Sequence, residues 1–428
     1  MIIIYAAGLL YVLVFLIVGW KRPAIPLMLI FALAPFQNDI GQFTSPQNPD
    51  APLLVTADGG GGVGGLPHFS IAEINLMLAA VLFILRRRPL LFGPLLVPTL
   101  LYFAVCSASS VLSWRSTTVT SMFQMGLYLI VAVALFTSLG RDERDYQLAF
   151  YGLVFVGVVL SLAVLILRTG YVLGLHKNGV GGSLACAAIV CAELWFSAPR
   201  GRRRTIISWA LAIIVAGLFF TLSRGGWVAA AAGIALILAM RREFQLLVKA
   251  GFALIPIIAI CWQLLPEQSR QYTTGLSTDN WNIRMRYNSV AFAREQFEES
   301  PYLGVGVGLR KEYDATNLFW LTLAETGILG ALTFFGLQFA FMRMAWKTQS
   351  RLSRSEPLFS AVAIGGALVF GGLVHGLVDH YWSRGAISIA WDGAGMVTYG
   401  YLVVRHRAAV ARAALVDETF LGGGVEVA

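Results

Sequence analysis

Arg224 stands in the run FFTLSRGGWVAAAA, which would be continuously apolar without Ser223, Arg224 and the two glycines that follow. An arginine at the centre of a bilayer costs about 2.5 to 3.5 kcal/mol, so it needs an interfacial position or a negatively charged partner. A side chain that reaches the interface explains the charge but not the break at Gly225-Gly226. We therefore expect Arg224 to contact an anion.

A second group of cations lies in the segment 265–317, the longest polar stretch in a mostly apolar chain. From Trp281 to Glu299 apolar residues recur at helical spacing, and Pro301 follows, which predicts an amphipathic helix. Arg284 and Arg286 would lie on different sides of this helix. They could bind an anionic substrate, or they could contact lipid phosphates, and the spacing alone leaves both open.

Glycines alternate from Gly304 to Gly308, and Arg310 and Lys311 follow them. Backbone amides around Gly306 and Gly308 could converge on an anion, with the two cations adding charge. The pattern matches neither a dinucleotide fingerprint nor a P-loop. A plain turn is the alternative.

Polar side chains that could bind substrate or move a proton occur in three further places. His176 and Lys177 begin the stretch HKNGVGGSLA, where small residues permit close helix packing. Glu325 lies two turns into the apolar run after the polar segment, where it could be a base or a buried hydrogen-bonding group. His375 and Asp379 are one helical turn apart, as a catalytic or a structural pair would be.

The elements that carry these residues must be membrane helices. Hydrophobic residues make up 57% of the 428 residues and charged residues only 13%, far from the balance of soluble domains. The net charge of +9 comes mostly from short basic clusters between apolar runs, which is typical of topology determinants and not of a nucleic-acid face. No nucleic-acid partner is expected.

Apolar runs long enough to cross a bilayer recur along the whole chain. The second of them, 23–36, contains three prolines and could be broken, so we expect twelve or thirteen spans in an all-α polytopic bundle. The spans are expected near 2–19, 23–36, 70–85, 90–112, 117–138, 147–167, 179–198, 205–222, 226–240, 247–265, 317–342, 357–378 and 385–404.

Placing the basic clusters on the cytoplasmic side gives a consistent alternation of these spans. It puts the long polar segment, Arg224, His176 and His380 on the outer face. We expect one membrane domain over 1–407, with the loop 266–316 as a lid, and a short cytoplasmic tail over 408–428. The first span lacks a basic start and a cleavage site, so we expect it to be retained.

No pattern indicates a metal or an organic cofactor. The cysteines Cys106, Cys186, Cys191 and Cys261 all fall in apolar runs and form no CxxC or Cys/His spacing. HExxH and GxSxG motifs are absent from the sequence. We expect buried free thiols and no metal or cofactor site.

Taken in order, TLSRGGW, the loop arginine before SPYLGVGVG, and TNLFWLTLAETGILG resemble the O-antigen ligase and polymerase superfamily of bacterial membrane glycosyltransferases. HKNGVGG is similar to a segment of its exopolysaccharide-polymerising members. The resemblance covers roughly 170–380. It implies metal-independent transfer of a glycan from undecaprenyl diphosphate to an acceptor hydroxyl, in ligation or polymerisation of a surface polysaccharide, on the outer face of the bacterial inner membrane.

The resemblance also implies roles for single residues. Arg224 would contact the diphosphate, and Arg286 would be the second such arginine, with Arg284 as the other candidate. Without a metal, arginines are suited to stabilise the negative charge of the leaving group. Asn317 corresponds to the asparagine that opens the next span in the family, and the acceptor could be a glycan, a lipid or a protein.

One position departs from the family pattern, because Thr316 stands where family ligases have a histidine that could activate the acceptor. Threonine cannot act as a general base near neutral pH. Either positioning of the acceptor suffices, or another group takes the role. The candidates are Asp314, Glu325, His176, His375, Asp379 and His380.

Two other classes of function fit the sequence less well than glycan transfer. A transporter or flippase of a lipid-linked oligosaccharide would be expected to show pseudo-symmetric repeats and midplane charges, whereas the unusual charges here gather on one face. A purely structural scaffold would leave the break beside Arg224 and the long loop unexplained. The absence of the histidine at Thr316 tilts the interpretation slightly towards polymerases.

Overall fold

The computed structural model describes residues 2–36, 70–87, 89–115, 117–140, 142–246, 248–249, 252, 259, 263, 281–313, 315–382 and 386–421. Regular structure in these parts of the chain is helical, without a β-strand. The all-α fold predicted from the sequence is thereby confirmed. Residues 37–69, with their run of glycines, lie outside the description.

The first half of the chain forms α1 (Ile2–Lys21), α2 (Ala24–Leu33), α3 (Ile71–Leu85), the 3-10 turn η3 (Gly93–Leu95), α4 (Leu96–Leu112), α5 (Thr118–Gly126), the π-helical η4 (Leu127–Ala132), α6 (Val133–Ser138), α7 (Glu143–Leu167) and α8 (Lys177–Ser197). The second half forms α9 (Arg202–Phe220), α10 (Arg224–Met240), α13 (Trp281–Glu299), α14 (Leu309–Glu312), α15 (Leu318–Gln349), α16 (Pro357–Gly376) and α17 (Ala386–Leu421).

In the described parts of the chain, seven stretches of helix are long and apolar enough to cross a membrane: Gly93–Leu112, Thr118–Ser138, Glu143–Leu167, Lys177–Ser197, Arg202–Phe220, Leu318–Gln349 and Pro357–Gly376. Helices α2, α3 and α10 and the described part of α1 are apolar but shorter. Every predicted span except 247–265 coincides with a helix, and most of 247–265 lies outside the described residues. The polytopic bundle is confirmed, and the number of twelve or thirteen crossings stays a prediction because part of the chain lies outside the described residues.

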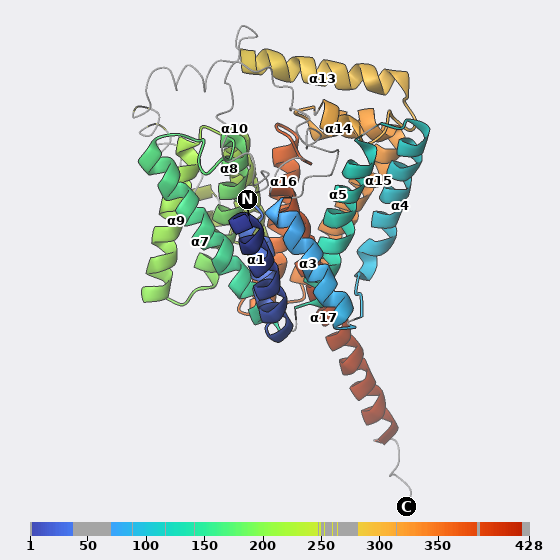
Figure 1. Ribbon diagram of the computed structural model, residues 1–428. Helices are drawn as coiled ribbons and strands as arrows, with labels where there is room; N and C mark the ends of the chain where they lie inside the picture. The colour runs from blue at the N-terminus through green and yellow to red at the C-terminus, as the bar shows by residue number, and fades with distance from the viewer. Residues whose placement is uncertain are drawn as a thin grey trace, which may run out of the picture.

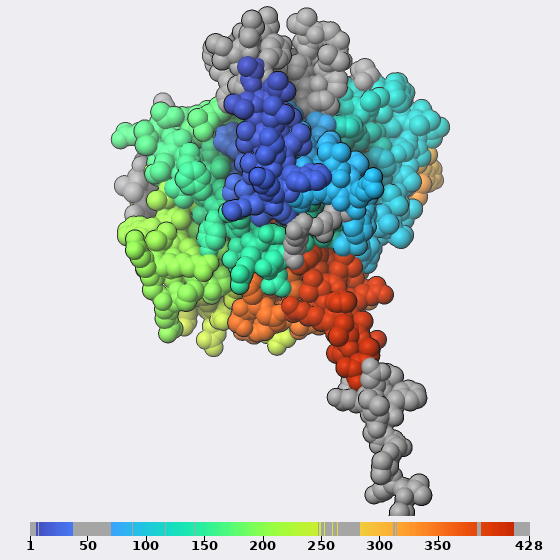
Figure 2. Space-filling model, turned by 60° about the horizontal axis from the view of Figure 1, so that its bottom comes forward, coloured from blue at the N-terminus to red at the C-terminus, as the bar shows by residue number. Residues whose placement is uncertain are grey.

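Helix α13 lies across one end of the bundle, and the C-terminal part of α17 projects from the opposite end (Figure 1). Helices α7 to α10 stand on one side, and α4, α5 and α15 stand on the other. Helix α1 lies on the outer surface (Figure 2), where Leu9, Leu13 and Ile17 are exposed as lipid-facing residues would be. The amphipathic helix predicted over Trp281–Glu299 is present as α13, with Ile283 and Ala293 buried and Tyr287 exposed.

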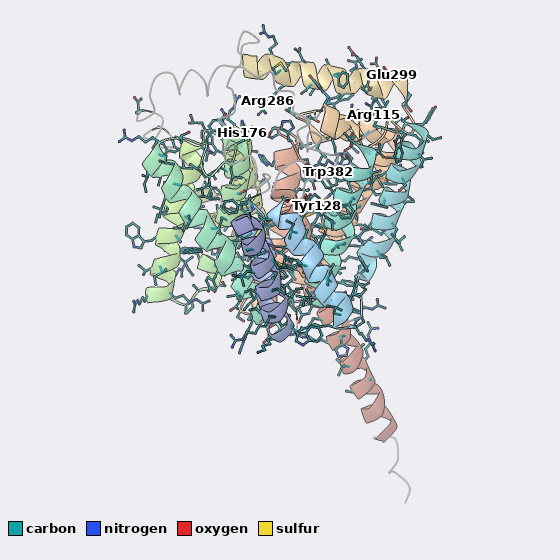
Figure 3. The ribbon with its side chains drawn as sticks, viewed as in Figure 1. Arg115, Tyr128, His176, Arg286, Glu299 and Trp382 are labelled. Atoms are coloured by element: carbon teal, nitrogen blue, oxygen red, sulfur yellow. The ribbon has the colours of Figure 1, made fainter. Side chains whose placement is uncertain are left out.

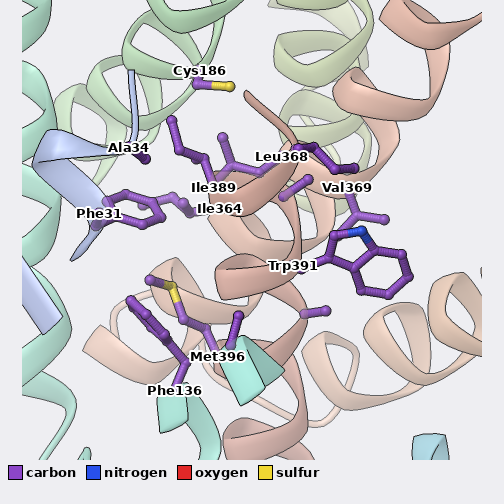
Figure 4. Close-up of a cluster of buried hydrophobic side chains, with 14 of the residues drawn as sticks. Phe31, Ala34, Phe136, Cys186, Ile364, Leu368, Val369, Ile389, Trp391 and Met396 are labelled. Carbon is purple, nitrogen blue, oxygen red and sulfur yellow. The ribbon is translucent and has the colours of Figure 1, made fainter. Parts of the chain in front are cut away.

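The core lies around α16 and the part of α17 that packs against it. A Cβ added at Gly365 would lie 2.3 Å from the Gly393 carbonyl oxygen, so the two backbones meet at glycines. Large buried side chains, Trp391 and Phe31 among them, fill the space around this contact (Figure 4). Small residues thus set the helix separation, as is common in membrane bundles.

Helix α15 is broken at Gly327, whose φ of 62° and ψ of −164° are not helical. The segment after α13 fills the break, because the Val305 amide donates to the Ala324 carbonyl at 2.8 Å and the Ile328 amide donates to the Pro301 carbonyl at 2.8 Å. A Cβ at Gly327 would lie 2.3 Å from the backbone of Tyr302. Glycine is therefore required here both by its positive φ and by the close approach of the inserted backbone.

Candidate active site

Helices α8 and α10 begin next to each other at the end of the bundle that α13 covers. Lys177 is the first residue of α8, and Arg224 is the first residue of α10. A Cβ added at Gly181 would lie 2.4 Å from the Cβ of Ser223, and one added at Gly226 would lie 2.8 Å from the Gly181 backbone. The glycines thus let two helix N-termini, each with a partial positive charge, come together with two cationic side chains.

His176 caps α8, and both of its ring nitrogens have polar neighbours. Its Nδ1 accepts a hydrogen bond from the Asn178 amide at 3.2 Å, and its Nε2 lies 3.3 Å from the Tyr171 hydroxyl. Since Nδ1 accepts from a backbone N–H, it carries no proton in this arrangement, and the neutral ring then holds its proton on Nε2. His176 is consequently occupied as a helix cap.

The C-terminal end of α16 packs against the first turn of α10. A Cβ at Gly225 would lie 2.8 Å from Cδ2 and 3.0 Å from Nε2 of His375, so the imidazole touches the turn that begins with Arg224. His375 Nε2 lies 3.8 Å from Asp379 Oδ2, and both side chains are buried. The other oxygen, Asp379 Oδ1, accepts from the His380 amide at 2.8 Å. The predicted pair is therefore formed and adjoins Arg224.

Two side chains hold the last carbonyl groups of this α16 end. Arg286 Nη1 on α13 donates to the Val378 carbonyl, and Asn317 Nδ2 donates to the Leu377 carbonyl at 2.9 Å. Figure 3 shows Arg286 and His176 at the same end of the molecule. Arg286, Asn317, His375 and Arg224 are thus linked through the end of α16.

Thr316, which precedes the α15 cap Asn317, lies against α13. Its hydroxyl is 3.1 Å from that of Ser289, and its amide donates to Ser289 Oγ at 3.4 Å. Ser289 is one helical turn from Arg286, so this contact fixes the part of α13 that carries the arginine. Arg284, the other candidate, is exposed.

The glycine segment has its amides largely paired within the protein. The Gly306 amide donates to the Glu325 carbonyl at 3.0 Å and to Ser109 Oγ at 3.1 Å, and the Gly308 carbonyl accepts from Thr117 Oγ1 at 2.8 Å. A Cβ at Gly306 would lie 2.5 Å from the Ser113 carbonyl oxygen. These contacts favour the plain structural alternative for Gly306 and Gly308 over an anion-binding nest.

Arg310 and Glu325 form a buried ion pair below this segment. The Arg310 side chain is 5% exposed and that of Glu325 is 0% exposed. Arg310 Nε lies 2.8 Å from Glu325 Oε2, Nη2 donates to the same oxygen, and the Arg310 amide donates to Oε1 at 2.7 Å. The guanidinium also lies 4.5 Å from the centre of the Trp382 ring.

Burial alone would lower the pKa of Arg310, but the adjacent Glu325 carboxylate raises it above its ordinary value. Arg310 is therefore protonated, and Glu325 is fully engaged as an acceptor. This geometry favours a structural role for both residues. The backbone of Lys311 is described but its side chain is not, and Asp314 lies outside the described residues.

The sequence interpretation missed Arg115, which anchors the C-terminal half of α13. Arg115 Nε donates to the Val305 carbonyl at 3.0 Å, and Nη2 lies 3.3 Å from Gln296 Oε1. Figure 3 shows Arg115 below the Glu299 end of α13. The polar run SASSVLSWRSTT between two apolar spans could have indicated such an anchoring loop.

In the parts of the chain that the structure describes, no group of three or more His, Cys, Asp and Glu side chains could hold a metal ion. The metal-independent reaction stays a prediction. Cys106, Cys186 and Cys191 are buried free thiols, as expected.

Residues 209–335 match the family model described as O-antigen ligase. The matched region is 127 residues long, under a third of the 428-residue chain, and contains Arg224, Arg286, Thr316 and Glu325. No curated protein matches the chain. The resemblance to the O-antigen ligase and polymerase superfamily is confirmed over this region, and the match supports a membrane glycosyltransferase of the O-antigen ligase type.

Proposed function

We propose that this chain, a member of the O-antigen ligase and polymerase superfamily by residues 209–335, transfers a glycan from undecaprenyl diphosphate to an acceptor hydroxyl. The observation that carries the proposal is that Arg224 and Arg286 lie at the same end of α16. Arg224 begins α10 against His375, and Arg286 reaches the Val378 carbonyl three residues further on. Two arginines from distant parts of the sequence therefore flank one helix end.

Two guanidinium groups fit a diphosphate leaving group. Each presents a planar fork of N–H donors that matches phosphate oxygens. In the proposed step the acceptor oxygen bonds to the anomeric carbon, the bond from that carbon to the diphosphate oxygen breaks, and the electron pair leaves with the diphosphate. Arg224, Arg286 and the N-terminus of α10 would stabilise this developing negative charge.

Lys177 and Asn317 would have binding roles beside these arginines. Lys177 begins α8, whose first turns contact the start of α10, so its ammonium group can add charge near the diphosphate. Asn317 caps α15 through the Trp320 amide at 3.2 Å while its Nδ2 holds Leu377. We assign Asn317 to positioning of the α16 end.

The proton of the acceptor hydroxyl needs a base, and His375 is the best placed candidate. Glu325 is engaged by Arg310, and His176 is engaged as a cap. His375 adjoins the first turn of α10, and Asp379 lies beside its Nε2. We propose that His375 accepts the proton and that Asp379 stabilises the imidazolium that results.

The working face would be extracytoplasmic in the bacterial inner membrane, because basic clusters on the cytoplasmic side predict that Arg224, His176 and α13 lie outside. The donor would be lipid-linked, and the acceptor would be a glycan, a lipid or a protein. Ligation and polymerisation both fit these residues. Thr316, in place of a histidine that could activate the acceptor, slightly favours polymerisation.

The first test uses the full chain, purified and reconstituted with an undecaprenyl-diphosphate-linked oligosaccharide. Arg224→Ala should reduce turnover about 10²- to 10³-fold, as loss of one oxyanion-stabilising group does. Arg294→Ala is the matched control, because Arg294 is an exposed arginine of α13 paired with Glu298 at 2.9 Å. Product size distinguishes a ligase, which makes one transfer, from a polymerase, which makes a ladder. Full activity of Arg224→Ala, or movement of the donor across vesicles without a glycosidic bond, would overturn the proposal.

The base is tested separately in the same assay. His375→Gln should lower kcat by about 10²-fold or more, which is the usual contribution of a general base, and should leave KM for the donor nearly unchanged. Asp379→Asn should have a smaller effect in the same direction. His380→Gln, a neighbouring buried imidazole, is the control. A loss confined to His380→Gln would move the role to that residue.

A further inference from the structure

The connection between α8 and α9 lies at the end of the bundle opposite α13 and carries an unusual concentration of positive charge (Figure 1). Arg202, Arg203 and Arg204 form the first turn of α9, and that turn contains no acidic residue. Cations at a helix N-terminus are unfavourable because the helix dipole is positive there. The arrangement therefore lacks an anion that would offset it.

Aromatic rings on two neighbouring helices orient two of these guanidinium groups. Arg204 Cζ lies 3.9 Å from the centre of the Trp195 ring on α8. Arg203 Nη2 donates to the Tyr151 hydroxyl on α7, and its Cζ lies 5.8 Å from the centre of that ring. The Trp195 indole N–H in turn donates to Ser208 Oγ at 2.9 Å. Held in this way, the guanidinium groups lose less freedom when they bind a ligand.

Two other arginines at this end of the bundle, Arg407 and Arg241, have carboxylate partners. Arg407 Nη1 lies 2.7 Å from Glu356 Oε2, and Arg241 forms a buried pair with Glu193. Among the described residues, no carboxylate forms an ion pair with the three arginines of the first α9 turn. They are thus oriented by aromatic rings and lack the charge compensation that Arg407 and Arg241 have.

Apolar side chains continue from the arginines towards the middle of the membrane. Ile206 and Trp209 follow Arg202 at helical spacing and are 58% and 68% exposed, and Phe155 on α7 is 69% exposed. Helices α7 and α9 pack against each other and lie on the same side of the bundle (Figure 2). A ligand held by the arginines would find an apolar surface suited to an acyl chain directly beside them. A free phosphate ion would make no contact with that surface.

We propose that the first turn of α9 binds the headgroup of an anionic glycerophospholipid. The phosphate accepts hydrogen bonds from Arg203 and Arg204, and an acyl chain lies along Ile206, Trp209 and Phe155. Guanidinium groups match phosphate oxygens, and basic residues at the membrane surface favour anionic lipids. This site is separate from the proposed transfer site at the other end of the bundle and does not depend on it.

The test titrates the purified full-length chain in detergent with phosphatidylglycerol or with phosphatidylcholine of the same acyl chains, with bound lipid counted by native mass spectrometry. The variant Arg203→Gln/Arg204→Gln should bind phosphatidylglycerol about 25-fold more weakly, at roughly fivefold for each arginine. The control variant Arg351→Gln/Arg354→Gln removes two exposed arginines from the same end of the bundle and should change binding less than twofold. Phosphatidylcholine binding should be the same in all three proteins.

A second variant guards against misfolding of the first. Arg203→Lys/Arg204→Lys keeps both charges but loses the planar fork and the ring contacts, so it should lose roughly fivefold in phosphatidylglycerol affinity. Equal losses in the site and control variants, or equal binding of the two lipids by the unaltered chain, would overturn the proposal. Displacement of the lipid by millimolar inorganic phosphate would show a free-anion site and would equally overturn it.

Discussion

Arg310 and Arg286 both lie at the α13 end of the molecule, yet their surroundings differ in every respect. Arg310 is buried and bound to both oxygens of Glu325 by its side chain and amide. Arg286 is half-buried and donates to a single neutral carbonyl, that of Val378. A buried carboxylate holds a guanidinium in one position. A neutral carbonyl partner, in contrast, can be replaced by a phosphate with only a small loss of free energy. Burial and partner, not residue type, separate the ion-paired Arg310 from Arg286, the proposed diphosphate contact.

The same division occurs at the opposite end. Arg241 caps α10 and forms a bidentate, buried pair with Glu193 of α8, whereas Arg203 and Arg204 lie at the surface against aromatic rings. Helix α10 is thus anchored by a buried ion pair at its C-terminus, while its N-terminal Arg224 is half-buried beside α16. Because the C-terminus of α10 is anchored, the position of Arg224 at its N-terminus is defined.

The largest effect is expected from Glu325→Gln, which removes the charge of Glu325 and keeps its shape. It leaves Arg310 buried without compensation, so the free energy of unfolding should fall by about 3 to 5 kcal/mol. Denaturant or thermal unfolding of the full chain in detergent measures this loss. Turnover per folded molecule should change little.

A paired variant sharpens this prediction. Glu325→Gln/Arg310→Met removes both charges and should recover most of the lost stability, because a buried ion pair can often be replaced by apolar groups of similar size. If Glu325→Gln were instead as stable as the unaltered chain and inactive, Glu325 would be a catalytic carboxylate. Burial and an ionic partner would then no longer distinguish Arg310 and Glu325 from residues that act on the substrate.

The next effect is expected from Arg286→Ala, measured against Arg284→Ala on the same helix. Loss of Arg286 should lower turnover about 10²-fold, because a donor to the leaving group is removed, and should change unfolding by less than about 1 kcal/mol. Arg284 is exposed and should be replaceable without loss. If Arg284→Ala were the inactive variant, the diphosphate contact would belong to Arg284, and α13 would have to be rotated in the working state.

Much of this arrangement could be predicted from the sequence. Apolar runs in the sequence located nearly all the helices, because a helix that crosses a bilayer needs a long run of apolar residues. The polar break at Arg224 marked the start of α10. The apolar runs did not reveal that α3 and α10, at 15 and 17 residues, are shorter than the seven longest apolar helices of the described chain. Length and apolarity do not distinguish a full crossing from a shorter buried helix.

The partners of polar residues could not be predicted, because they lie on other elements of the fold. Glu325 was expected to be a base or a buried hydrogen-bonding group, but it forms an ion pair with Arg310 on α14. Gly304 to Gly308 matched an anion nest in composition, whereas Ser109 and Thr117 from another helix pair bind that segment. Only three-dimensional contacts decide which of several equivalent-looking groups is already engaged.

The smallest effect on stability is expected from Arg407, an exposed arginine with a carboxylate partner. Arg407 Nη1 donates to Glu356 Oε2 at 2.7 Å just before α16 begins, and this hydrogen bond lowers the pKa of Glu356 from its ordinary value of 4.5. A lowered carboxyl pKa contributes stability above pH 4.5 that is lost as the pH falls through the folded-state pKa. Because both side chains are partly exposed, the contribution should be below about 1 kcal/mol. Unfolding of Arg407→Gln should match that of the unaltered chain at low pH and fall slightly below it at pH 7. A larger gap, comparable with that of Glu325→Gln, would mean that burial does not set the strength of these pairs.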